Sequence, residues 1–169
     1  MRNIFLIGPM GSGKTTIGRQ LASRIGKEFY DTDKEIEKRT GVDVARIFEI
    51  EGEDGFRARE TKMLKDLASK NDTIIATGGG AILVEENRNC IKENGQVVYL
   101  KSSSQKLYDR TARDKKRPLL NTDDRMATIE ELLKIRGPFY EAAADVIVST
   151  DDEPVKQIMN KIINCLKLT

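Results

Sequence analysis

The sequence contains no histidine, and cysteine is scarce. Without histidine, the Ser-His-Asp and Cys-His catalytic arrangements are excluded, together with the commonest metal ligand in proteins. The two cysteines, Cys90 and Cys165, lie far apart and form no C-x-x-C motif, which argues against a disulfide framework and a zinc knuckle. We therefore expect a cytoplasmic protein whose catalysis uses carboxylates, lysine, arginine, backbone N–H groups or a bound metal.

Long hydrophobic runs and an excess of one charge are also missing. The apolar run near the N-terminus covers only residues 4–7, which is too short for a signal-peptide core or a membrane span. Lysine and arginine number 29 against 27 aspartates and glutamates, so the formal net charge is +2. Because no overall field attracts polyanions, we expect no nucleic-acid or membrane partner. A chain of 169 residues predicts one domain.

Short apolar runs alternate with charged stretches of helical period. Residues 4–7 are followed by a glycine loop and then by helical spacing from Thr15 to Ile25. The further strand candidates are residues 28–30, 73–76, 96–100 and 146–148. This alternation predicts a doubly wound α/β fold with about five parallel strands. Two stretches interrupt it: about three helical segments are expected between Asp33 and Ser69, and residues 114–124 are typical of a mobile flap.

Residues 8–15 spell G-P-M-G-S-G-K-T, a complete G-x-x-x-x-G-K-[ST] motif between a predicted strand and a predicted helix. In such a loop the backbone N–H groups surround phosphate oxygens, Lys14 reaches the β- and γ-phosphates, and the Thr15 hydroxyl completes a Mg²⁺ site. A plain glycine turn would need neither side chain. The motif predicts ATP contacts from Gly11, Ser12, Gly13, Lys14, Thr15 and Thr16.

A carboxylate for the metal must come from outside the third strand, which runs into threonine and glycines. The GTPase signatures D-x-x-G and N-K-x-D are absent as well. Asp31 and Asp33 follow the second strand, where parallel sheets place their ligands. Asp31 would face the metal and Asp33 the acceptor hydroxyl. Helix capping is the competing explanation, because Thr32 and Glu35 form a capping-box pattern, and both roles are compatible.

Three glycines and two arginines are further site candidates. Gly78, Gly79 and Gly80 follow a strand and would expose backbone N–H groups to a substrate, whereas a tight turn needs only one glycine. Arg57 and Arg59 lie two apart on a predicted helix, so at most one is expected to enter a cleft. From this segment alone, a solvated ion pair with a neighbouring glutamate is the better explanation for each of them.

Two more arginines lie in segments that proline interrupts. Arg117 in the flap would stabilise charge on a transferring phosphoryl group and exclude water. Arg136 precedes Gly137 and Pro138, which are expected to stop its helix, and an interaction with the helix dipole explains this arginine equally well.

Six segments together resemble those of shikimate kinases in order and spacing: G-P-M-G-S-G-K-T-T-I-G, F-Y-D-T-D, G-F-R-A-R-E, T-G-G-G-A, K-K-R-P-L-L and R-G-P-F-Y. The resemblance covers nearly the whole chain. It implies one shikimate kinase domain over residues 1–169, of the nucleoside-monophosphate-kinase type with strand order 2-3-1-4-5. A substrate-binding insertion at about 33–69 and a lid at about 112–124 belong to that fold. The implied reaction is ATP-dependent, Mg²⁺-assisted phosphorylation of the 3-hydroxyl of shikimate by a monomer.

The resemblance also implies roles for single residues. Arg57 and Arg136 would bind the shikimate carboxylate, while Asp33 and Gly79 hold ring hydroxyls. Asp33 would accept the proton of the attacking hydroxyl, and Lys14 and Arg117 would neutralise the transferring phosphoryl group. Adenine contacts are implied for Arg110 and for the loop after the last strand, where this chain has Glu153.

Two rival functions remain open at this point. A kinase for gluconate or for a nucleoside monophosphate would share the loop and the fold. A nucleotide-binding switch without transfer chemistry is the second rival, but it would not need an acceptor-side carboxylate together with a lid arginine. The acceptor panel of a kinase assay separates these possibilities.

Overall fold

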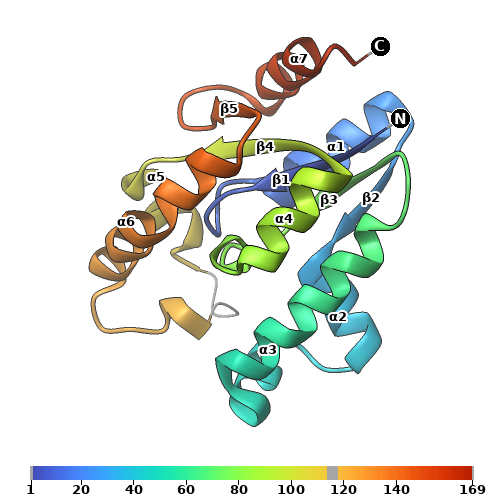
Figure 1. Cartoon of the computed structure of the whole chain (residues 1–169). Helices are drawn as coiled ribbons and strands as arrows, with labels where there is room; N and C mark the ends of the chain where they lie inside the picture. Colours follow the sequence, from blue (N-terminus) through green and yellow to red (C-terminus); the bar gives the residue numbers. More distant parts are fainter. Residues whose placement is uncertain (1, 114–117, 169) are drawn as a thin grey trace.

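A parallel sheet of five strands forms the centre of the molecule, in the order β2-β3-β1-β4-β5 (Figure 1). This computed structural model describes residues 2–113 and 118–168. The strands are β1 (Asn3–Ile7), β2 (Glu28–Asp31), β3 (Thr73–Ala76), β4 (Gly95–Lys101) and β5 (Val146–Ser149). Each predicted strand is confirmed to within one residue at either end, and the order is the one that the resemblance implied.

The central strand β1 explains why its sequence is continuously apolar. It pairs with β3 on one side and with β4 on the other, so that Ile4 lies beside Ile74 and Gln96. All five residues of β1 are buried. A strand of a parallel sheet that is covered on both faces has no polar face to display.

Helices cover both faces of the sheet and make three layers (Figure 1). On one face, α1 (Lys14–Ile25) and α7 (Val155–Leu166) pack against the strands through residues such as Leu21 and Ile162. The other face carries α2 (Thr32–Thr40), α3 (Val44–Ala68), α4 (Glu85–Asn94) and α6 (Arg125–Ala143). The remaining elements are α5 (Ser104–Thr111) and the short 3₁₀ segments η1 (Ala81–Leu83) and η2 (Pro118–Leu120). Among the described residues, none of the helices is both long and apolar enough to cross a membrane.

The helical insertion between β2 and β3 consists of α2 and α3. Gly52 interrupts α3 with φ 73° and ψ −177°, so the insertion contains three helical segments, as predicted. A positive φ is accessible to glycine without the steric cost that a side chain brings. The break therefore has a direct cause in the sequence.

The prediction that Gly137 and Pro138 stop their helix is wrong. α6 runs without interruption from Arg125 to Ala143, with Pro138 inside it. A proline in a helix interior costs about 3 kcal/mol, so the turn that follows must be held by other contacts. Tyr140 supplies them: it is 1% exposed, and its ring stacks on Tyr99 of β4 with centroids 5.0 Å apart. Tertiary packing therefore outweighs the local stop signal.

Candidate active site

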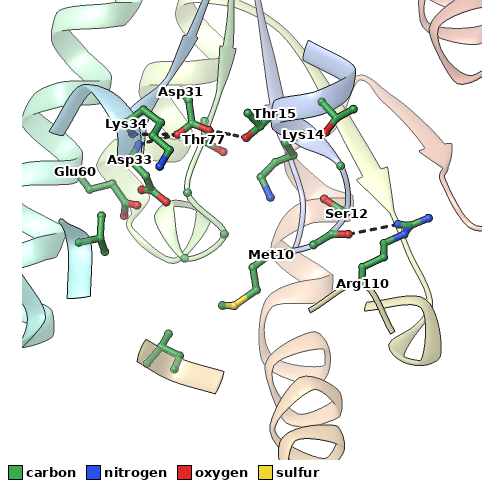
Figure 2. Close-up of a pocket in the computed structure, with 18 of the residues that line it drawn as sticks. Met10, Ser12, Lys14, Thr15, Asp31, Asp33, Lys34, Glu60, Thr77 and Arg110 are labelled. Atoms are coloured by element: carbon green, nitrogen blue, oxygen red, sulfur yellow. Dashed lines mark hydrogen bonds between the residues drawn. The ribbon is translucent and has the colours of Figure 1, made fainter. Parts of the chain in front are cut away.

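One cavity of about 580 Å³ lies beyond the carboxyl ends of the strands (Figure 2). Its walls come from the loop after β1, the start of α2, α3, the glycines after β3, α5, α6 and the loop after β5. Every site residue that the sequence predicted lines this cavity except Arg117, which lies outside the described residues. The cavity therefore unites candidates that are up to about 120 positions apart in the chain.

The phosphate-binding loop, residues 8–15, forms the middle of the cavity wall. Gly8, Gly11 and Gly13 have positive φ values of 147°, 84° and 95°. A Cβ at Gly11 would also lie only 2.8 Å from the Thr111 side chain. Gly13 caps α1 without a side-chain hydrogen bond, which leaves the N-terminus of that helix open to a phosphate.

Lys14 is held at the centre of this loop. Its Nζ donates hydrogen bonds to Gly8 O at 2.7 Å and to Pro9 O at 2.8 Å. The side chain is almost buried, with the residue 9% exposed. Two loop carbonyls thus orient the ammonium group beside the backbone N–H groups that would bind phosphate.

Asp31 joins the phosphate loop to the start of α2. Its Oδ2 accepts a hydrogen bond from Thr15 Oγ1 at 2.6 Å, and its Oδ1 accepts from the N–H groups of Asp33 and Lys34 at 3.0 and 3.2 Å. Asp31 is therefore the N-cap of α2. The predicted capping box at Thr32 is wrong, because Thr32 is already inside the helix whereas Asp31 has an extended backbone.

The pairing of Thr15 with Asp31 also fits a magnesium ion. A hydroxyl and a carboxylate are the hard oxygen ligands that Mg²⁺ takes together with nucleotide phosphates. Within the described residues, no group of three or more histidine, cysteine, aspartate or glutamate side chains could hold a metal.

A cluster of opposite charges forms the far end of the cavity. Arg57 of α3 donates from Nη1 to Glu60 Oε1 at 2.8 Å, and Arg136 of α6 interacts electrostatically with the same carboxylate. Glu60 is 0% exposed and Arg136 is 3% exposed. Burial raises the pKa of Glu60, although the Arg57 guanidinium acts in the opposite direction. Arg57 also donates from Nη2 to Glu53 at 3.3 Å, and the two guanidiniums are the groups of this cluster that can bind an anionic ligand.

The neighbouring arginine behaves differently. Arg59 pairs with Glu51 at the surface through two hydrogen bonds of 2.9 and 2.6 Å, and both side chains are partly exposed. The prediction that at most one of Arg57 and Arg59 enters a cleft is confirmed. Glu60 was not predicted as a site residue, although its position three after Arg57 on a helix was a signal that could have revealed it.

Little space remains beside the three glycines. A Cβ at Gly78 would lie 2.3 Å from Glu60 Oε2, and one at Gly80 would lie 2.3 Å from Arg57 Nη2. At Gly79 it would approach Met10 N at 3.3 Å. The expectation of open N–H groups is wrong for Gly78, whose N–H donates to the Thr32 hydroxyl at 3.1 Å. Gly79 alone of the three is more than minimally exposed.

Asp33 lies between the two ends of the cavity. Figure 2 shows it beside Asp31 and Glu60, across the cavity from Lys14. Its Oδ1 would be 3.1 Å from a Cβ at Gly78, so the carboxylate reaches the glycine loop. This placement puts a hydrogen-bond acceptor between the phosphate loop and the arginine cluster.

Arg110 marks the opposite end. Its Nη2 donates to Thr150 O at 2.6 Å, and its Nη1 to Gly11 O at 3.4 Å, so the guanidinium connects the phosphate loop with the segment after β5. Glu153 and Ile158 line the same end of the cavity. Glu153 is engaged in an ion pair with Lys161. The planar guanidinium of Arg110, held by these hydrogen bonds, offers a flat surface on which a base can stack.

Comparisons with known proteins agree with one another. The model of the family described as shikimate kinase matches residues 10–167. The shikimate kinase of Histophilus somni is 51% identical over 98% of this chain and 95% of its own length. Shikimate kinase 1 of Yersinia pestis is 52% identical over 98% of this chain and 96% of its own length.

A solved structure gives the same answer. The shikimate kinase of Acinetobacter baumannii, whose structure is a complex with shikimate, superposes with a TM-score of 0.97 at 45% identity, over 99% of this chain and 93% of that one. Fold, phosphate loop and sequence similarity thus lead to one conclusion. The chain belongs to the shikimate kinase family.

Proposed function

We propose that this chain transfers the γ-phosphoryl group of ATP to the 3-hydroxyl of shikimate, a step of chorismate and aromatic amino acid biosynthesis. One observation carries the proposal: a single cavity has a complete phosphate loop at one end and, at the other, the buried Arg136 together with the partly buried Arg57. Phosphoryl transfer depends chiefly on positioning and on charge stabilisation, and this cavity provides for both. Membership of the family supports the same reaction.

Arg57 and Arg136 bind the shikimate carboxylate in this proposal. They approach the cavity from α3 and α6, and ion pairs with Glu53 and Glu60 hold Arg57 in place. A carboxylate that accepts hydrogen bonds from guanidinium groups is fixed in direction as well as in place. The two guanidiniums would therefore hold the substrate carboxylate and orient the ring.

Asp33 and the main chain at Gly79 hold the ring hydroxyls. Asp33 accepts a hydrogen bond from the attacking hydroxyl and takes its proton late in the transfer. A strong base is not required, because the transition state is loose and little charge develops on the nucleophile.

The phosphates are bound by the N–H groups and side chains of residues 11–16, with Lys14 neutralising the transferring group. Thr15 and Asp31 hold one Mg²⁺ per subunit, which screens the charge of the phosphate oxygens when bound. Arg110 contacts the adenine. Arg117 is proposed to cover the phosphates, although it lies outside the described residues.

The remaining proposals concern organisation. Residues 1–169 form one domain, in which the insertion at about 33–69 carries acceptor-side residues and the segment at about 112–124 is the lid. The protein acts as a cytoplasmic monomer on shikimate and ATP, without nucleic-acid or membrane partners. The near-balance of charge, with a net value of +2, supports the absence of polyanionic partners.

The test is ADP release in a coupled spectrophotometric assay with ATP and Mg²⁺. Five reactions are compared: no acceptor, shikimate, gluconate, AMP and CMP. We expect turnover with shikimate alone. Turnover with another acceptor would retain a kinase but reject the substrate, and slow hydrolysis that no acceptor changes would reject the transfer reaction.

A further inference from the structure

Tyr140 contacts the glycine loop from a buried position on α6. Its hydroxyl donates a hydrogen bond to Gly79 O at 2.5 Å, and the residue is 1% exposed. Tyr140 does not line the main cavity, so a ligand there would not touch it. The proposed reaction gives this hydroxyl no role.

The Tyr140 hydroxyl and the Arg136 guanidinium both lie against Gly79. Residues 136 and 140 are four apart on α6, which places them on one face of the helix. A Cβ at Gly79 would lie 3.4 Å from Arg136 Nη1, so the guanidinium packs against Gly79. One helical face therefore holds the carbonyl of Gly79 and presents a guanidinium beside the same residue.

The position of the hydroxyl is set from outside the site. The Tyr140 ring stacks on Tyr99 of β4 at an interplanar angle of 28°, so the central sheet fixes the ring. Burial raises the pKa of Tyr140 well above its usual range, which keeps the hydroxyl protonated as a donor. The hydroxyl therefore keeps its proton at any pH at which a kinase is assayed.

The loop is also anchored on its other side. The N–H of Gly78 donates to Thr32 Oγ1 of α2 at 3.1 Å. Because a peptide unit is planar, fixing the Gly79 carbonyl also fixes the direction of the following N–H group. The loop is therefore tied to α2 through residue 78 and to α6 through residue 79.

We propose that Tyr140 is a positioning residue for the acceptor. Its hydroxyl holds Gly79 at a fixed position relative to Arg136, so that the main chain and one guanidinium contact the substrate in a fixed arrangement. The inference rests on the proposed function, because it concerns the binding of shikimate. It assigns the tyrosine to acceptor binding and not to phosphoryl transfer.

The test compares Tyr140→Phe with Tyr99→Phe, which removes a hydroxyl from the other ring of the same stacked pair. Loss of one hydrogen bond predicts that Tyr140→Phe raises the KM for shikimate by about three- to tenfold. The KM for ATP and kcat should stay at their wild-type values. Tyr99→Phe should change none of the three constants, and thermal unfolding of both variants reports their stability.

A third variant separates the hydrogen bond from the stability of the fold. With p-aminophenylalanine at position 140, a weaker N–H donor occupies the place of the hydroxyl, so the KM for shikimate should lie between those of wild type and Tyr140→Phe. A value equal to that of Tyr140→Phe would contradict the proposal. If Tyr140→Phe did not fold, this variant alone would decide, and a wild-type KM would contradict the proposal.

The outcomes also distinguish the inference from the proposed function. If the wild-type protein does not phosphorylate shikimate, the proposed function fails and the inference fails with it. If the wild type is active and Tyr140→Phe lowers the melting temperature without changing the KM for shikimate, only the inference is overturned. In that case the hydroxyl would serve the stability of the fold alone.

Discussion

The two ends of the cavity are built in different ways. The nucleotide end consists mainly of eight consecutive residues, 8–15, and it presents backbone N–H groups at positive-φ glycines. The acceptor end is built from side chains of separate elements, with Asp33, Arg57 and Arg136 spread over more than half of the chain. Phosphate can be bound by the main chain, so its site fits into one motif. Recognition of a small carboxylate needs side chains that only the fold brings together.

Asp33 lies where the two ends meet, and its loss should have the largest effect. Asp33→Asn keeps the size of the side chain but removes the charged acceptor for the hydroxyl proton. We expect kcat with shikimate to fall by about 10²- to 10⁴-fold, the usual contribution of a positioned general base, while the KM for ATP is retained. Steady-state kinetics in both substrates measures this, and an unchanged kcat would remove Asp33 from the mechanism.

Lys14→Met should impair the function of the nucleotide end alone. The variant loses the ammonium group that Gly8 O and Pro9 O orient, and with it the charge that stabilises the transferring phosphoryl group. We expect kcat to fall by about 10²- to 10³-fold. Shikimate binding, followed by calorimetric titration without nucleotide, should be unaffected. A parallel loss of shikimate binding would show that the two ends are not separable.

Arg57→Ala should impair shikimate binding at the acceptor end alone. Arg59→Ala is its matched control on the same helix. A charge-assisted hydrogen bond contributes about 1.5–3 kcal/mol, so the KM for shikimate should rise by about 10- to 100-fold in Arg57→Ala. Arg59 pairs with Glu51 at the surface, and its removal should leave that KM unchanged. Equal effects of the two substitutions would contradict the assignment of Arg57.

Glu60→Gln should have the smallest effect on catalysis, raising the KM for shikimate a few-fold because Arg57 loses its charged partner. Its effect on stability depends on pH. Burial raises the pKa of Glu60 above the reference value of 4.5, so its contribution to stability is full below that pH and is lost as the pH rises through the folded-state pKa. The variant lacks this titration, and its free energy of unfolding should therefore fall less than that of wild type as the pH rises.

Urea unfolding at several pH values from about 4 to 7 checks this difference. Glu51→Gln is a control of opposite sign on the same helix, because the hydrogen bond from Arg59 lowers the pKa of the exposed Glu51. Curves of stability against pH that run parallel for wild type and Glu60→Gln would show that Glu60 does not carry the raised pKa.

The same comparison explains what the sequence could predict. Strands, helix order and the phosphate loop follow from local patterns, and the structure confirms them. The continuation of α6 through Pro138 was not predictable, because Tyr140 packs against a strand some 40 residues away. The cap of α2 at Asp31 was missed for a similar reason. A capping box would need the Thr32 hydroxyl as its acceptor. That hydroxyl instead accepts a hydrogen bond from the N–H of Gly78, in the loop after β3.

The role of Glu60 could not be predicted from the sequence alone. Its spacing from Arg57 indicated an ion pair, but only the fold shows that the pair is buried against Gly78 and faces Arg136. The sequence predicted that Gly78, Gly79 and Gly80 are glycines because they expose N–H groups to a substrate. The structure gives a different reason for glycine at these positions. They are small because charged side chains of the acceptor end lie against them.

The central claim is that the acceptor end recognises a carboxylate through Arg57 and Arg136. It is tested most directly by measuring kcat/KM for shikimate and for its methyl ester in wild type and in Arg57→Ala. We predict that esterification lowers kcat/KM of the wild type by about 10²-fold and that of Arg57→Ala by much less, because the arginine and the carboxylate act as a pair. The same factor in both proteins would contradict the claim.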